Sequence, residues 1–171
     1  MNEASPPKHI NKGLVIDDID CMTILSQAEA DNKIRLQKAF VDKRPLIINR
    51  PYNEKRQLIS LYEPIETFYL YITQTAIDFG NYSTVTRYFQ IPLVRACIDP
   101  DKKHTNPDGT QINGPHIHIY REGFLDKFAQ PLPKGDFPDL GIVQFVRAFL
   151  RYCSIGDIQI NDQNVLPDGN L

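Results

Sequence analysis

The 171-residue chain contains no tryptophan, only three cysteines, and no apolar run long enough to cross a membrane as a helix. Cys21, Cys97 and Cys153 are far apart in the sequence and form no Cys-x-x-Cys pair. We therefore expect reduced thiols in a cytoplasmic protein rather than a disulfide-bonded secreted scaffold. Residues 1–13 contain no hydrophobic stretch, so neither a signal peptide nor a membrane anchor is expected there.

The chain also lacks a strong net charge, because 19 Lys and Arg residues and 21 Asp and Glu residues give −2 at pH 7. This balance excludes a strongly basic nucleic-acid coat protein. The charge is unevenly distributed, since residues 43–128 hold eleven basic and nine acidic residues while both ends of the chain are acidic. An anionic partner is therefore expected to bind the middle of the chain.

Apolar periodicity indicates one domain with short flanking segments. Residues 1–13 are expected to be a flexible lead, residues 14–156 a single α+β domain, and residues 157–171 a loosely ordered tail. Three-to-four spacing of apolar residues predicts one amphipathic helix over 17–42 and a second over 140–153. The expected architecture is thus a sheet flanked by an N-terminal and a C-terminal helix.

Between these helices, alternating aromatic and β-branched residues are typical of strands. Most connections are too short for crossover helices, so we expect a mainly antiparallel sheet of five or six strands. A polar loop over 100–115 interrupts the pattern and contains the turn signal Pro107-Asp108-Gly109. The predicted strands are 46–48, 57–62, 67–73, 84–89, 93–99 and 116–120.

Polar side chains on the last two predicted strands are expected to share one face. Alternation places His116, His118 and Tyr120 on one side of their strand, with Ile117 and Ile119 on the other. If this strand pairs with 93–99, the polar faces of both coincide. The expected catalytic residues are Arg95, Asp99, His104, His116 and His118.

Two imidazoles and a guanidinium on a rigid face are suited to acid–base cleavage of a phosphodiester. We expect His116 and His118 to share the acid and base roles and Arg95 to bind the phosphate. Asp99 is expected to orient a histidine, and His104 to close the site from the loop. This route requires no metal or cofactor. The residues expected to contact the substrate are Arg87, Asn106 and Tyr120.

A second interpretation of the same residues is a metal site, because two histidines at positions i and i+2 of a strand are common ligands. Asp99, His104 or Asp108 would supply a third ligand. By contrast, Tyr69 and Tyr71 are interpreted as half-buried sheet residues rather than a base-stacking platform, since the glycine-aromatic run typical of RNA-recognition domains is missing.

Residues 93–132 resemble a family of small bacterial proteins found near mobile elements. The resemblance depends on the Arg95-x-x-x-Asp99 strand, on His104 in the loop, and on the His116-x-His118 pair. The same layout is similar to TumE-like toxin components of toxin–antitoxin pairs. The resemblance implies an RNA-cleaving or growth-inhibiting role, with these five residues at the motif positions.

Three functions are therefore compatible with the sequence. The leading hypothesis is a toxin-like, metal-independent ribonuclease or RNA-binding growth inhibitor. The alternative from another class is a prophage-encoded protein that inhibits a host or defence protein through the loop 100–115 and the histidine face. The third is a metal-binding His-x-His protein. The expected partners are RNA, a protein antitoxin or a host protein, and not a membrane.

Overall fold

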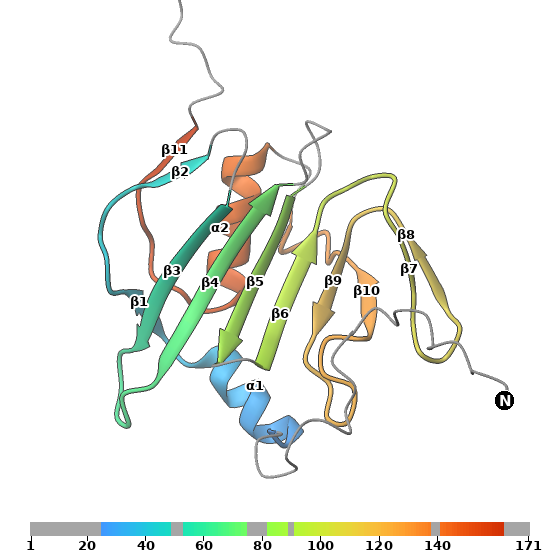
Figure 1. Cartoon of the computed structure of the whole chain (residues 1–171), viewed down its shortest axis with the longest axis horizontal. Coiled ribbons are helices and arrows are strands. Elements are labelled where there is room, and N and C mark those ends of the chain that lie inside the picture. Colours follow the sequence, from blue (N-terminus) through green and yellow to red (C-terminus); the bar gives the residue numbers. More distant parts are fainter. Residues whose placement is uncertain (1–24, 49–52, 75–81, 89–90, 138–140, 163–171) are drawn as a thin grey trace, which may run out of the picture.

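The main element of the computed structural model is a seven-stranded antiparallel sheet with the strand order β1-β3-β4-β5-β6-β9-β10 (Figure 1). The structure describes residues 25–48, 53–74, 82–88, 91–137 and 141–162. The strands of the sheet are β1 (Lys38–Phe40), β3 (Asn53–Ser60), β4 (Thr67–Gln74), β5 (Tyr82–Tyr88), β6 (Ile91–Cys97), β9 (His116–Ile119) and β10 (Ala129–Pro131).

Two small sheets complete the strand inventory of the described residues. β2 (Leu46–Ile48) pairs in parallel with β11 (Ile160–Asp162), and β7 (Lys103–Thr105) pairs antiparallel with β8 (Gln111–Asn113). The predicted α+β class with an N-terminal and a C-terminal helix is confirmed. The main sheet is larger than the five or six strands expected, because β1 and β10 have only three residues each, too few to show an alternation.

The N-terminal helix α1 (Gln27–Arg35) is shorter than predicted. It begins after a capping box, in which the Ser26 hydroxyl accepts a hydrogen bond from the Glu29 amide and the Glu29 carboxylate accepts one from the Ser26 amide. The prediction of helix up to residue 42 was wrong, because Lys38–Phe40 pair with β3 as a strand. Residues 17–24 of that predicted helix lie outside the described residues.

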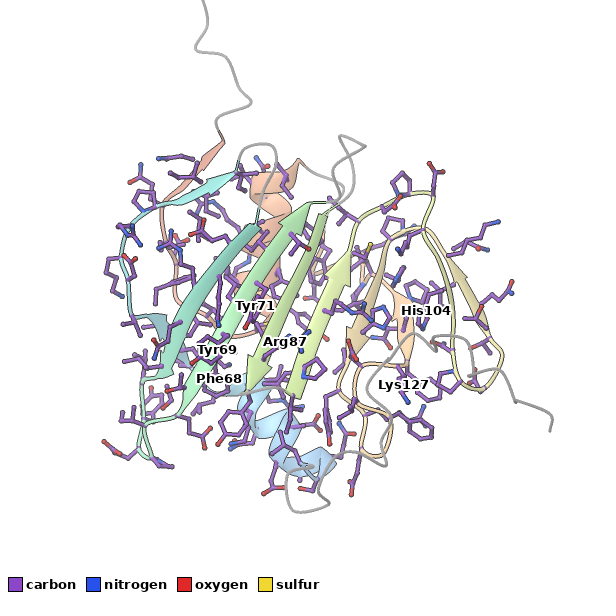
Figure 2. All side chains as sticks on the ribbon, viewed as in Figure 1. Phe68, Tyr69, Tyr71, Arg87, His104 and Lys127 are labelled. Carbon is purple, nitrogen blue, oxygen red and sulfur yellow. The ribbon has the colours of Figure 1, made fainter. Side chains whose placement is uncertain are left out.

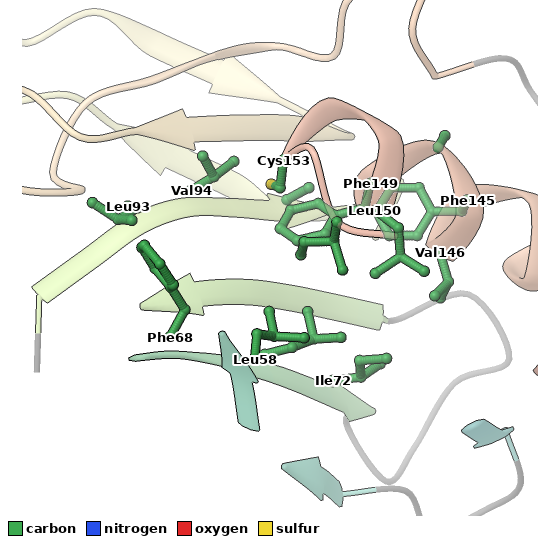
Figure 3. Packing of buried hydrophobic residues seen from close by; sticks show 14 of the residues in the cluster. Leu58, Phe68, Ile72, Leu93, Val94, Phe145, Val146, Phe149, Leu150 and Cys153 are labelled. Atoms are coloured by element: carbon green, nitrogen blue, oxygen red, sulfur yellow. The ribbon is translucent and has the colours of Figure 1, made fainter. Parts of the chain in front are cut away.

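The C-terminal helix α2 (Ile142–Tyr152) confirms the prediction and covers one face of the sheet (Figures 1 and 3). Its buried residues Phe145, Val146, Phe149 and Leu150 follow three-to-four spacing and pack on the apolar face of the strands. The core therefore lies between α2 and the sheet.

The opposite face of the sheet carries no helix of the described residues, and we call it the open face (Figure 2). Directly paired residues of antiparallel strands point to the same side. The register therefore places Lys55, Tyr71, Arg95 and His118 in one row across β3, β4, β6 and β9, with Val85 of β5 in the middle. The predicted catalytic residues Arg95, His116 and His118 therefore lie together on the open face.

Residues 157–162, assigned from the sequence to a loosely ordered tail, include β11, whose Ile160 is buried. The predicted lead over 1–13 and the rest of the tail, 163–171, lie outside the described residues. No helix in the described part of the chain is long and apolar enough to span a membrane.

Candidate metal centre

Two histidines project from β9 onto the open face. His116 pairs with Cys97 and His118 with Arg95 in the antiparallel ladder between β6 and β9. This register confirms that the two strands pair and that both histidines share a face with Arg95. The histidine side chains are almost completely buried, with 2% and 1% exposure. They are therefore not solvent-exposed side chains on an uncovered face of the sheet.

The third histidine is brought to this pair by a hairpin. Residues 100–115, predicted as a polar loop, contain β7 and β8, joined by the predicted turn in which Gly109 adopts a φ of +86°. His104 lies on β7, and its ring centroid is 4.6 Å from that of His118 and 5.7 Å from that of His116. The hairpin thus places the His104 imidazole over one end of the open face.

Asn106 attaches the hairpin to the main sheet. Its side-chain amide nitrogen donates to the Ala129 carbonyl oxygen at 3.0 Å, and its amide oxygen accepts from the Ala129 backbone nitrogen at 2.7 Å. Both ends of the amide are used inside the protein and the residue is only 7% exposed. Asn106 therefore holds the hairpin against β10.

Each of the three imidazoles has one ring nitrogen against a main-chain carbonyl oxygen. Since a carbonyl oxygen only accepts, that nitrogen carries the hydrogen, and the lone pair of the neutral ring lies on the other nitrogen. For His118, whose Nδ1 also lies 3.3 Å from the donor Arg95 Nη2, the shorter 2.8 Å contact with the Asp126 carbonyl sets the tautomer. One ligand nitrogen from each ring lies within 4.8 Å of the others. The three bonds are His104 Nε2 to Lys127 O at 2.9 Å, His116 Nδ1 to Gly114 O at 2.7 Å, and His118 Nδ1 to Asp126 O at 2.8 Å.

The β9–β10 connection supplies two of these carbonyls and also holds Arg95. The carboxylate of Asp126 lies 3.1 Å from Arg95 Nε, while Arg95 Nη2 lies 3.3 Å from His118 Nδ1. Sequence reasoning missed Asp126 because it lies outside any periodic segment. The turn signal at Gly123, whose φ is +77°, marks the connection but does not show that its carbonyls point back to the histidines.

Three residues predicted for the site lie elsewhere. The Asp99 carboxylate accepts from the Asp101 amide at 2.9 Å in the turn after β6, and Asp99 is not among the clustered ligand residues. Tyr120 follows the last residue of β9, is 1% exposed within the core, and donates its hydroxyl to the Leu25 carbonyl oxygen. Arg87 lies on the open face, with its guanidinium 5.7 Å from the ring centroid of Tyr71.

The surroundings favour neutral histidines. Burial, with the nearby charge of Arg95 as the next contribution, lowers the pKa of His118 to about 3. Burial also lowers the pKa of His116, although its bond to the Gly114 carbonyl opposes the shift. Neutral imidazole is the form that coordinates a metal, whereas a general acid must carry a proton.

The described residues thus form an α+β protein with a cluster of three histidines, two buried and one half-buried, beside an arginine on an antiparallel sheet. The chain belongs to a family of unknown function, DUF6978, whose model matches residues 25–155. These bounds run from the residue before the α1 cap to three residues beyond the end of α2, so the cluster lies inside the family domain. No curated protein and no solved structure matches the chain.

Proposed function

We propose that the protein binds one divalent transition-metal ion through His104, His116 and His118. The observation that carries the proposal is the hydrogen-bonding of the three rings, each of which donates one N–H to a main-chain carbonyl. Metal-bound histidines almost always donate their second nitrogen in this way, because the bond fixes the tautomer and the ring orientation. Among the described residues, no thiol or carboxylate joins the cluster.

The spacing of the three ligand atoms fits a metal after a small movement. Three nitrogens at about 2.1 Å from one tetrahedral zinc lie about 3.4 Å from one another. One nitrogen of each ring lies within 4.8 Å of the others, so if these nitrogens bind the ion their separations shorten by at most about 1.4 Å. β7 and β8 pair only with each other, so a small shift of His104 need not change the ladder of the main sheet, although Asn106 ties the hairpin to β10.

Three protein ligands leave one coordination position open, which is the arrangement of catalytic rather than structural zinc sites. Arg95 lies beside His118, with its Nη2 3.3 Å from His118 Nδ1 and its Nε paired with the Asp126 carboxylate, so it places a cation next to the cluster. Imidazole ligands suit zinc, copper, iron and nickel, and zinc serves as the reference ion for the tests.

Metal-free acid–base cleavage of RNA by His116 and His118 is less well supported by their surroundings. Burial lowers the pKa of both histidines and so disfavours the protonated form that a general acid needs. A toxin-like nuclease remains compatible with a metal in this site, since a metal ion can activate water and neutralise phosphate charge.

Elemental analysis of the protein prepared without a histidine tag is the direct test. We expect one equivalent of zinc or another first-row ion per chain, removed by a chelator and restored by titration. Absence of stoichiometric binding for zinc, cobalt, nickel, copper and iron would contradict the proposal. RNA cleavage that persists in chelator and disappears in His118→Gln would support the acid–base mechanism instead.

Removing the side chain that attaches the hairpin should weaken the site without removing a ligand. Asn106→Ala loses both hydrogen bonds to Ala129, so His104 is no longer held over the β9 pair. Because groups that orient metal ligands typically contribute about 10- to 100-fold in affinity, we expect zinc Kd to rise by roughly that factor. Gln111→Ala, an exposed change on β8, is the matched control. Equal zinc affinity in Asn106→Ala and wild type would show that the hairpin is positioned by other contacts.

A further inference from the structure

The open face continues away from the three-histidine cluster as a row of cationic and aromatic side chains. The row consists of residues paired directly across adjacent strands. In order these are Lys55 of β3, Tyr71 of β4, Val85 of β5, Arg95 of β6 and His118 of β9. Four strand-to-strand steps of about 4.8 Å separate Lys55 from His118, so the row is roughly 19 Å long. This length corresponds to a few nucleotides of an extended strand.

Two half-buried tyrosines of β4 lie on this face, Tyr71 in the row itself and Tyr69 in the neighbouring row with Arg87 (Figure 2). The ring centroids of Tyr69 and Tyr71 are 6.5 Å apart. The Lys55 ammonium lies 4.6 Å from the first centroid and 5.4 Å from the second, and the Arg87 guanidinium lies 5.7 Å from that of Tyr71. Each ring therefore has a cation over it, and aromatic rings with adjacent cations are a combination that suits bases joined by phosphates.

The charge of this face is positive among the described residues. Glu54 is the only carboxylate within β3, β4, β5, β6 and β9. It pairs with the buried Ile72, so it lies on the core-facing side of the sheet and not on the open face with Lys55. Asp126, at the edge of the face, is already paired with Arg95. Because Asp126 offsets the charge of Arg95, Lys55 and Arg87 give this surface its positive charge, which is complementary to a polyanion.

We propose that the open face binds single-stranded nucleic acid, with bases stacked on Tyr69 and Tyr71 and phosphates beside Lys55 and Arg87. The strand would run toward Arg95 and the three-histidine cluster. Stacking on these rings requires unpaired bases, so a duplex is a poor ligand. The proposal deepens the proposed function by naming a polymer class for that site, but the binding contacts themselves do not involve the metal.

Fluorescence anisotropy with short labelled oligouridine, oligothymidine and a duplex tests the binding. We expect both single strands to bind more tightly than the duplex. Tyr69→Ala/Tyr71→Ala should raise Kd roughly ten-fold or more, because stacking contributes about that factor per base. Lys55→Ala should make the plot of log Kd against log salt less steep by about 0.7. The matched controls are Tyr62→Ala in the β3–β4 connection and Lys134→Ala, both exposed, which should bind like wild type.

The binding measurements also distinguish the nucleic-acid proposal from the metal proposal. Equal binding by wild type and the double tyrosine variant, or no binding of single strands at low salt, would overturn the nucleic-acid face whatever the metal content. Loss of binding in the tyrosine variant of chelator-treated protein would support the face even if no metal binds. The measurement therefore uses both the chelator-treated and the zinc-loaded full chain.

Discussion

His104→Ala is expected to lower zinc affinity by about 1000-fold or more, since the loss of a ligand costs more than the roughly 10- to 100-fold contributed by an orienting group. The variant leaves two ligands on β9 and removes the one on the hairpin. His104 is less buried than His116 and His118 and belongs to the small β7–β8 sheet, so the main sheet should remain folded. The loss can thus be attributed to the ligand rather than to unfolding.

The same variant should lose the stabilisation that zinc gives to the wild type. A ligand at 100 times its Kd stabilises the folded state by about 2.7 kcal/mol. For a chain of this size that corresponds to a rise in Tm of roughly 5–10 °C. We expect this rise in wild type and in Gln111→Ala, and no rise in His104→Ala at the same zinc concentration. Circular dichroism follows the transition, because the chain contains no tryptophan. An equal zinc-dependent rise in His104→Ala would remove His104 from the ligand set, and His118→Gln would then report on the β9 pair alone.

The part of the site that depends on strand alternation could be predicted from the sequence. His116, His118 and Arg95 share a face because the side-chain period of a strand is two, and pairing of the two strands follows from the short connections. His104 was included because it lies in the loop between them. The hairpin that places it was not expected, since three-residue strands such as β7 and β8 have too little pattern to be recognised.

Two of the residues that do not join the histidine cluster lie just beyond the ends of strands. Asp99 and Tyr120 were assigned by extending the alternation beyond Cys97 and Ile119, the last residues of β6 and β9. The groups that orient the histidines are the main-chain carbonyls of Gly114, Asp126 and Lys127. Every residue has such a carbonyl, so the residue type does not reveal which ones accept these bonds. Sequence patterns therefore locate ligands on strands better than they locate the groups that fix those ligands.

Lys38→Met is expected to destabilise the fold by about 3 kcal/mol, which is the scale for leaving buried hydrogen-bonding groups without partners. Lys38 is 1% exposed, and its ammonium donates to the carbonyl oxygens of Ile34 at 3.0 Å, Leu36 at 2.7 Å and Cys153 at 2.8 Å. These carbonyls belong to the ends of α1 and α2, where the last turns lack intrahelical partners. The lysine thus ties both helix ends to β1. Methionine has a similar length but no donor.

Urea unfolding followed by circular dichroism measures the loss, and Lys134→Met at an exposed position is the control for removing one charge. The variant should fold to the same secondary structure with a lower urea midpoint, and Tm should fall by roughly 6–12 °C. Stability equal to wild type would mean that methionine packing offsets all three lost hydrogen bonds. The fold would then not depend on Lys38 to hold the helix ends.

The pH dependence of the unfolding free energy provides a second test of Lys38. Burial lowers the pKa of Lys38 to about 8, below its value of 10.5 in an exposed chain. Between these two values the unfolded state binds more protons than the folded state, so this residue makes stability rise with pH across that window. Other groups also titrate there, and the difference in unfolding free energy between wild type and Lys38→Met isolates the lysine. We expect this difference to increase from pH 8 to pH 10. A constant difference would show that the lysine keeps its proton in the fold, because the three carbonyls stabilise the ammonium enough to offset its burial.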